Sequence, residues 1–363
     1  MAAAAPSVPP AASARARPAG RHPWLSVVWA AIRTARGAAG LALASLVVLI
    51  AVVGPWVAAK PPDALLTIPY AKPSGELPLG SDFLGRDVLS RVLNGGWALL
   101  LMAAAATAFG IAVGAAAGIS AAYLRGRPDS FIMRTVDVIL AFPQLVFALL
   151  LVSLLGPKLW LIVLAVGLTH APAVGRVIRS ATLDISERDY VKVVELQGMR
   201  PVKVMSSEIL PNLISPLMVE AGLRLTYSIV IITGLAFLGF GQAPPAANWG
   251  LMINENRSGL PLNPWAVIVP AALIALLTIG TNTFTDAIAR VTIGVDRRPE
   301  EDPGHLRIPA QRPEREERVR EEGEQAEEGH ARDRIAHLIV LGLDGGRGGD
   351  DGTHSADARA DGD

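Results

Sequence analysis

The 363-residue sequence contains no cysteine, few aromatic residues and none of the common motifs of nucleotide hydrolysis or proteolysis. Without cysteine, disulfide bonds, thiolate metal sites and cysteine nucleophiles are excluded. The absence of a GxxxxGK[ST] phosphate loop indicates that the chain does not hydrolyse ATP itself, and no HExxH or Gly-x-Ser-x-Gly pattern points to another hydrolase. We therefore assign no catalytic residue, no metal ligand and no cofactor, and we expect any energy to come from another subunit.

Hydrophobic residues, by contrast, make up 51% of the chain, and the mean hydropathy is +0.39. This composition indicates a membrane protein rather than a soluble domain. The net charge of zero conceals an asymmetry, because 18 of the 33 acidic residues follow Pro299. Residues 1–299 hold 24 basic and 15 acidic side chains. A basic excess of this kind is typical of the cytoplasmic loops of a membrane protein, and nothing in it points to nucleic acid.

Six apolar segments are long enough to cross about 30 Å of hydrocarbon. We place them at residues 38–59, 98–123, 131–155, 159–178, 213–240 and 264–288. The predicted fold is therefore all-α, a polytopic membrane protein with six transmembrane helices. The second segment carries Gly110, Gly114 and Gly118, a four-residue spacing that lets helices approach closely.

Arginine marks one side of the membrane. It flanks the apolar segments at positions 33 and 36, 125 and 127, 176 and 179, and 290, 297 and 298. The positive-inside rule then places both termini and the polar loop 186–212 in the cytoplasm, and residues 60–97 and 241–263 outside. We expect a disordered basic N-terminus over residues 1–37 and a disordered charged tail over residues 299–363. The tail is either a solvated extension or a regulatory, partner-binding segment.

The loop 186–212 predicts a short helix from Tyr190 to Leu196, a turn at Gly198 and a second helix starting at Pro201. Exposed valines at 193 and 194 would fit a groove of a soluble partner. The loop resembles the cytoplasmic EAA loop of permease subunits in binding-protein-dependent ABC importers, although Lys192-Val193-Val194 replaces Glu-Ala-Ala and so reverses one charge. The resemblance implies that ATPase subunits are contacted by the following residues: Lys192, Val193, Val194, Glu195, Gly198, Leu210 and Pro211.

Three further stretches are similar to the oligopeptide, dipeptide and nickel subfamily of these permeases. They are Leu79–Arg91 outside the membrane, Leu238–Gly241 with Asn248–Gly250, and Arg134 with Asp137 and Ala141–Pro143 in the third span. The similarity covers residues 80–298, and it implies a MetI-like permease core over residues 98–298 preceded by an additional helix at 38–59 and an extracytoplasmic segment at 60–97. It also implies a bacterial or archaeal inner membrane as the location.

Ionisable residues inside a bilayer are costly and usually serve a purpose. Asp137, Glu220, Arg224 and Asp286 lie within predicted spans, and Pro143 is expected to kink the third. Glu220 and Arg224, four residues apart, either neutralise each other on one helix face or line a translocation path. We expect His170 to serve packing or hydrogen bonding rather than a proton relay.

The sequence thus favours a permease subunit that lies in the lipid bilayer and imports peptides or similar small solutes. Its expected partners are a second permease, two ABC ATPases bound on the cytoplasmic side and a solute-binding protein outside. Import of a nickel chelate by the same machinery is the alternative within the subfamily. An ion-driven carrier or channel, or a membrane scaffold or sensor acting through its acidic tail, are the alternatives from other classes.

Overall fold

The computed structural model describes residues 23–241 and 246–293, which belong to one compact unit spanning residues 1–297. Within the described residues the regular secondary structure is helical, and two isolated β-bridges join Leu65 to Arg86 and Ser81 to Asp87 in the loop between α2 (Ala35–Val57) and α3 (Val88–Asn94). Residues 1–22 of the predicted N-terminal segment and all of the predicted tail at 299–363 lie outside the described residues.

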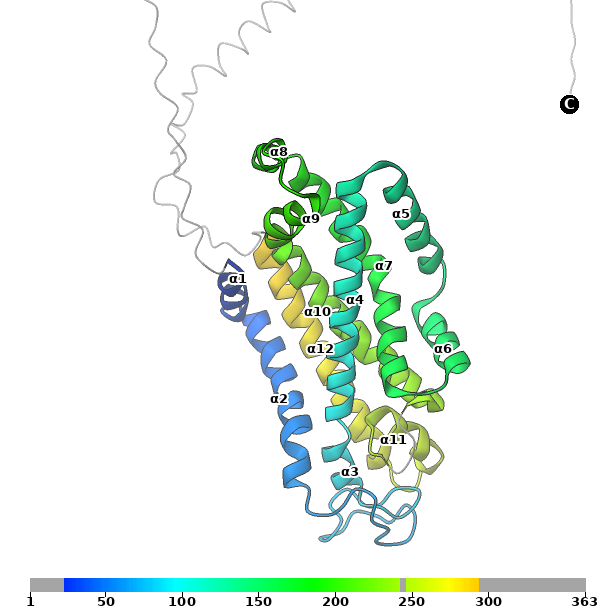
Figure 1. The fold of residues 1–363 in the computed structure, drawn as a ribbon. Helices are drawn as coiled ribbons and strands as arrows, with labels where there is room; N and C mark the ends of the chain where they lie inside the picture. The colour runs from blue at the N-terminus through cyan, green and yellow to red at the C-terminus, as the bar shows by residue number, and fades with distance from the viewer. Residues whose placement is uncertain (1–22, 242–245, 294–363) are drawn as a thin grey trace, which may run out of the picture. The chain divides into compact units, whose positions relative to one another are not determined.

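Five long helices run side by side (Figure 1). They are α2 (Ala35–Val57), α4 (Trp97–Leu124), α7 (Leu159–Ser186), α10 (Ile214–Leu235) and α12 (Trp265–Ile293). The shorter helices are α1 (Pro23–Ile32), α3 (Val88–Asn94), α5 (Gly126–Leu140), α6 (Gln144–Leu155), α8 (Asp189–Leu196), α9 (Pro201–Val204) and α11 (Trp249–Asn256). In Figure 1, α8 and α9 lie at one end of the bundle, and α3, α11 and the loop that precedes α3 lie at the other.

Five segments of the described chain are long and apolar enough to cross a membrane, and α5 with α6 supplies a sixth if that bent pair is counted as one span. The third span predicted at 131–155 corresponds to this pair, and the kink expected there is a sharp bend, because α5 and α6 meet at an angle of 89°. The break falls at the predicted Ala141–Pro143 position. Pro143 lacks the N–H that would continue the helix, and a residue before proline is disfavoured in helical geometry, so the chain turns sharply there.

Two other boundaries differ from the sequence prediction. Helix α7 continues to Ser186, eight residues past the predicted end of the fourth span, because Arg176 and Arg179 pair with carboxylates of α5 instead of ending the helix. Residues 23–32, predicted to be disordered, form α1. Ala31 of this helix is fully buried against Ala287 and Ile288 of α12, and this packing orders a segment whose composition alone gives no such signal.

The small residues of α4 bring it into close contact with α7. A Cβ atom added to Gly114 would lie 2.5 Å from the carbonyl oxygen of Ala171, and one added to Gly118 would lie 2.5 Å from that of Gly175. Both separations are too short for real atoms, so the predicted close approach is confirmed. Such contact makes α4 and α7 a tightly packed pair on which the rest of the bundle is assembled.

Candidate coupling loop and polar clusters

Helix α8 is fixed to the end of the bundle by one apolar side chain. Val191 is fully buried in a cluster that includes Ile178 and Ile185 of α7 and Leu213, just before α10. The predicted helical segment is therefore present, and it is attached to the two long helices that flank the loop. Any force applied to α8 is transmitted first to this cluster.

The predicted contact residues of α8 lie largely in solvent. Val193 is 51% exposed and Leu196 is 88% exposed, whereas Val194 is half-buried. Lys192 and Glu195 are exposed beside them. A short helix that displays apolar residues among charges is suited to insertion into a groove of another protein.

Gly198 ends α8 through its backbone conformation. Its φ is +79°, its N–H donates to the carbonyl of Glu195 (2.9 Å), and the N–H of Met199 donates to the carbonyl of Val194 (3.3 Å). These two bonds form a Schellman motif, in which glycine is preferred because it adopts the left-handed region without strain. Glycine here could also let a partner protein approach closely, but within this chain a Cβ atom added to Gly198 would meet nothing within 4 Å. The requirement for glycine shown by this chain is therefore conformational.

The return from the loop to the membrane is irregular. Pro201 begins α9 at its first turn, as predicted, and a π-helical turn over Met205–Ile209 and a 3₁₀ turn over Leu210–Leu213 then lead into α10. Pro211 lies in the 3₁₀ turn, where its missing N–H is accommodated by the change in helical pitch. Leu210 and Pro211 are exposed, so the two predicted contact residues of this half also face solvent.

Of the four ionisable residues predicted within the spans, three form ion pairs and the fourth, Asp286, is exposed. Arg224 Nη2 lies 2.8 Å from Glu220 Oε2, and both side chains are buried on α10, so the predicted pairing is confirmed. Asp137 accepts a hydrogen bond of 2.5 Å from Arg176 of α7, with both side chains more than half exposed. Asp286 is exposed on α12. The structure does not bring these three positions together into one site.

A buried polar cluster joins three long helices and was only partly foreseen. Ser228 Oγ of α10 lies 2.9 Å from His170 Nε2 of α7 and 3.0 Å from Thr107 Oγ1 of α4. His170 thus serves hydrogen bonding, as expected. Its partners were missed because single hydroxyl residues in apolar helices give no distinct sequence signal. A second pair that the sequence did not predict joins α7 to α5, where Arg179 donates two hydrogen bonds of 2.6 Å to Asp129.

At the opposite end of the bundle, the stretch Leu79–Arg91 forms a buried ionic cluster. Asp82 Oδ2 accepts hydrogen bonds from Arg86 Nε (2.7 Å) and Arg91 Nη1 (2.5 Å). Glu255 of α11 accepts from Arg91 (2.9 Å) and Arg86 (3.3 Å). Two cations and two anions lie within reach of one another, so the buried charges compensate each other.

Further hydrogen bonds extend this ionic cluster into a larger structure, which we call the cap. Asp87 caps α3 by accepting from the N–H and the hydroxyl of Ser90 (3.1 and 2.6 Å). Trp249 Nε1 donates to the carbonyl of Val92 (2.8 Å), and Asn263 Nδ2 donates to the carbonyls of Leu79 and Ser81, each at 2.9 Å. The two segments predicted to lie outside the membrane are therefore one joined structure. Sequence reasoning selected the motif residues but missed Glu255 and Asn263.

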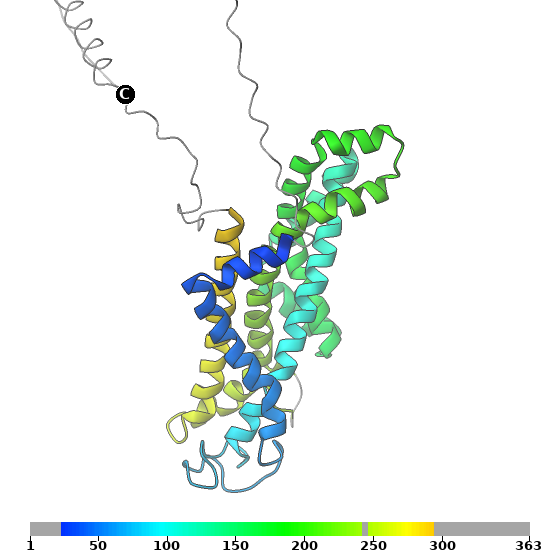
Figure 2. The same cartoon turned by 90° about the vertical axis from the view of Figure 1, so that its left-hand side faces the viewer.

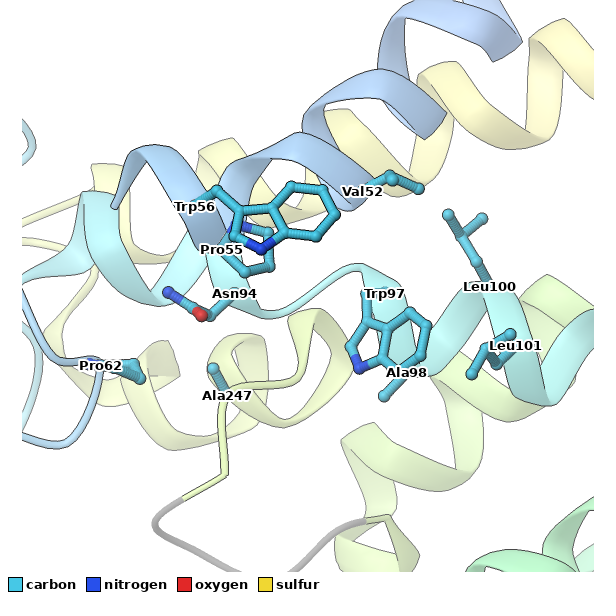
Figure 3. A pocket seen from close by; sticks show the side chains of 10 residues that line it. All are labelled: Val52, Pro55, Trp56, Pro62, Asn94, Trp97, Ala98, Leu100, Leu101 and Ala247. Atoms are coloured by element: carbon cyan, nitrogen blue, oxygen red, sulfur yellow. The ribbon is translucent and has the colours of Figure 1, made fainter. Parts of the chain in front are cut away.

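A cavity of about 590 Å³ opens between the end of α2 and the start of α4 (Figure 3). Its lining is Val52, Pro55, Trp56, Pro62, Asn94, Trp97, Ala98, Leu100, Leu101 and Ala247. No charged side chain lines it, and the amide of Asn94 already donates to the carbonyl of Ser90. A ligand with charged ends would find no partner there. None of the predicted site residues contributes to it, and in the described residues no group of three or more His, Asp or Glu side chains is placed to hold a metal ion.

Comparison with known proteins identifies the family. Residues 110–293 match the family described as the inner membrane component of binding-protein-dependent transport systems. A di/tripeptide transport system permease protein of Pseudomonas aeruginosa is 34% identical over 272 residues, which cover 73% of this chain and 90% of that protein. A probable D,D-dipeptide transport system permease protein of Escherichia coli is 33% identical over 244 residues, covering 67% of this chain and 82% of that protein.

A putative peptide transport system permease protein of Brucella suis gives a similar result, with 32% identity over 253 residues, 69% of this chain and 85% of that protein. The family match over residues 110–293 runs from within α4 to the end of α12 and includes the loop 186–212. These matches agree with the all-α membrane architecture and with the resemblance stated from the sequence. The chain belongs to the family of inner membrane components of binding-protein-dependent transport systems.

Proposed function

We propose that this chain is a permease subunit of an ABC importer that carries peptides into the cell. The supporting observation is that three relatives, 32–34% identical over about two thirds or more of the chain, are each described as peptide, dipeptide or di/tripeptide permeases. Nothing in these relatives or in the described residues favours the nickel alternative. The chain supplies part of the path and no chemical step, so ATP hydrolysis belongs to partner subunits.

The complex requires three kinds of partner. A second permease closes the translocation path, two ATPases bind the loop 186–212 of each permease, and a solute-binding protein delivers the peptide from outside. The multi-pass chain lies in the inner membrane with the loop 186–212 and both termini in the cytoplasm, in line with the positions of its arginines.

The coupling mechanism follows from how α8 is attached. When the ATPases close on ATP, a groove on each one moves the α8 helix that it holds. Val191 transmits this displacement through the apolar cluster to Ile178 and Ile185 of α7. Because α7 is continuous over 28 residues and is in close contact with α4, the pair moves as one body and rocks the bundle between inward-open and outward-open states.

The remaining predicted residues are assigned by their exposure. Asp137 with its partner Arg176, and the break at Pro143, lie on the surface of the single chain, where the second permease or the path adjoins α5 and α6. The buried Glu220–Arg224 pair lies within α10, where the two charges compensate each other, and we assign it a structural role. Asp286 is exposed near the end of α12, at the cytoplasmic side of the path.

Uptake measurements test the substrate. A strain that lacks the gene should lose ATP-dependent uptake of a labelled dipeptide to background level, and the restored gene should recover it, with nickel accumulation unchanged in both strains. Loss of nickel accumulation with unaffected dipeptide uptake would select the nickel alternative. Uptake that persists in energy-depleted cells with an ion gradient would select the carrier.

The absence of cysteine makes the ATPase contact directly testable. Leu196→Cys places a single thiol in the chain, at its most exposed position on α8. A thiol-specific crosslinker in native vesicles should join it to an ATPase subunit. Leu84→Cys, in the extracytoplasmic segment, is the matched control and should give no such product. An equal yield from both positions, or none from Leu196→Cys, contradicts the proposed contact.

A further inference from the structure

Another cavity lies where α2 begins and α12 ends, and its lining shares no residue with the cavity of Figure 3 or with the coupling loop. It measures about 350 Å³. Its lining comes from the corner between α1 and α2 and from the last turns of α12, namely Thr34, Ala35, Arg36, Ala287 and Arg290. Two guanidinium groups from helices far apart in the sequence thus border one small space.

Neither arginine has an anionic partner in the part of the chain that the structure describes. No acidic side chain lines the cavity, and Asp286, one turn before Arg290 on α12, forms no ion pair with it within that part. The Thr34 hydroxyl is fully used, since it donates to the carbonyl of Ala31 (2.7 Å) and accepts from the N–H of Gly37 (3.0 Å). Both arginines are exposed, so the cavity is a polar recess at the surface of the bundle, with two positive charges that no described residue compensates. An anion bound between them would lower their mutual repulsion.

The neighbouring helix α1 marks this recess as lying at the membrane surface. In Figure 2 the dark blue α1 crosses the end of the bundle at a steep angle to the long helices. Its Ala31 packs on Ala287 and Ile288 of α12. Trp29 of α1 is 58% exposed, and the Arg33 guanidinium lies 5.2 Å from its ring centroid. Exposed tryptophan beside arginine at the start of a spanning helix is typical of the headgroup level of a bilayer.

Apolar side chains continue from the recess along both helices. On α12, Ile279 and Leu276 precede Arg290 by 11 and 14 residues and are exposed. On α2, Leu43 and Ile50 are half-buried, because Leu43 lies against Gly280 of α12 and Ile50 packs on the apolar core. The apolar surface that extends into the membrane below the recess is therefore formed by the exposed residues of α12 and by the exposed Leu46 and Leu49 of α2. An occupant of the recess can therefore combine an anionic group with hydrocarbon chains.

We propose that Arg36 and Arg290 bind the phosphate of an anionic phospholipid, whose acyl chains lie along the α2–α12 surface. The recess takes the phosphodiester between two guanidinium groups, and the apolar side chains below it contact the hydrocarbon. Free inorganic phosphate shares the headgroup chemistry but gains nothing from the apolar surface. The lipid would hold α2 against α12 at the membrane surface. This inference depends on membrane insertion and is independent of which solute the protein carries.

Lipid binding to the full chain, purified together with its co-expressed partner subunits and stripped of endogenous lipid, tests the proposal. Native mass spectrometry after titration with phosphatidylglycerol or phosphatidylcholine should show phosphatidylglycerol bound at least about tenfold more tightly, as expected from two charge-assisted contacts. Arg36→Gln with Arg290→Gln should abolish that preference. Arg127→Gln, an exposed arginine at the same end of the bundle and outside the recess, is the control and should retain it.

Additional variants and a competition experiment test the lipid assignment even if the double glutamine variant does not fold. If the double glutamine variant does not fold, Arg36→Lys with Arg290→Lys keeps both charges and should retain part of the preference, whereas Arg290→Gln alone should weaken it several-fold. Inorganic phosphate at equal concentration should not displace phosphatidylglycerol; displacement would identify a site for soluble anions and overturn the lipid assignment. Equal binding of the two lipids to the unmodified protein would overturn it as well.

Discussion

The two ends of the helical bundle are built in opposite ways. At the end formed by α3 and α11, Asp82, Arg86, Arg91 and Glu255 form a buried cluster of compensating charges, and Asn263 adds side-chain bonds to backbone carbonyls. At the other end, α8 is held through Val191 in one apolar cluster, and its contact residues face solvent. The charges of the cap are compensated within the chain, while the coupling loop presents a surface suited to a partner.

This difference fits the tasks proposed for the two ends. A cap that joins residues 79–92 to residues 249–263 ties α3 and α11 together, so the ends of several long helices cannot separate there. The loop also has polar contacts, from Glu195 to Tyr123 and from Glu187 to Arg125, but its fully buried anchor, Val191, is apolar. Because apolar contacts are not directional, the loop can shift as a unit. Motion applied at the coupling loop therefore acts on a bundle that is clamped at the far end. The predictions below test whether the two ends differ in this way.

The largest effect is expected from Asp82→Asn. Loss of the carboxylate leaves Arg86 and Arg91 buried with only Glu255 to compensate them, which should cost about 3–5 kcal/mol in stability. Thermal unfolding of the purified protein should show a clear fall in Tm, with early proteolysis within residues 60–97. Asp63→Asn, an exposed aspartate of the same segment, should leave Tm unchanged. Equal Tm values for the two variants would show that the ionic cluster does not hold the cap.

A smaller loss is expected at the coupling loop from Val191→Ala. Removing two buried methyl groups should cost about 2 kcal/mol, including the cavity that remains. The matched variant is Val193→Ala in the same helix, where a half-exposed side chain should contribute no more than about 0.5 kcal/mol. Hydrogen exchange should therefore be faster in α8 of the first variant only. Similar exchange in both would mean that Val191 is not the anchor.

Gly198→Ala should have a weaker, local effect. Alanine at a φ of +79° costs about 1 kcal/mol, although its Cβ atom meets nothing within 4 Å. Gly75→Ala is the control, because that glycine also has open space but does not have a positive φ. We expect faster hydrogen exchange at the end of α8 for Gly198→Ala and none of this change for Gly75→Ala. Partial recovery by Gly198→Asn, which tolerates the left-handed region, would confirm the conformational reason.

The sequence was a good guide where a signal is local. Apolar length located the spans, Pro143 located the break in the third, and the spacing of Glu220 and Arg224 predicted their ion pair. The turn at Gly198 was predicted too, from the conformational freedom of glycine. In each case the residues that determine the structure lie within a few positions of one another, so their spacing carries the information.

The structural features that the sequence did not predict depend on contacts between residues far apart in the chain. Glu255 could not be matched to Arg91, 164 positions earlier, because no single-chain pattern links them. The full length of α7 depends on ion pairs with α5, and α1 is ordered by packing on α12. The 89° angle between α5 and α6 also has no local signal beyond the proline that permits it. The sequence therefore located the candidate coupling loop more fully than the cap.

The smallest effect on stability, and the sharpest test of the comparison, is expected from Leu196→Ser. Because this side chain is 88% exposed, its loss should change the free energy of unfolding by no more than about 0.5 kcal/mol. Leu262→Ser, an exposed leucine at the opposite end, should be equally neutral for stability. Co-purification of the ATPase subunits should separate the two variants, falling for Leu196→Ser and remaining normal for Leu262→Ser. If the ATPases stay bound to both, the exposed apolar residues of α8 are not the docking surface, and the two ends differ in how they are held but not in what they bind.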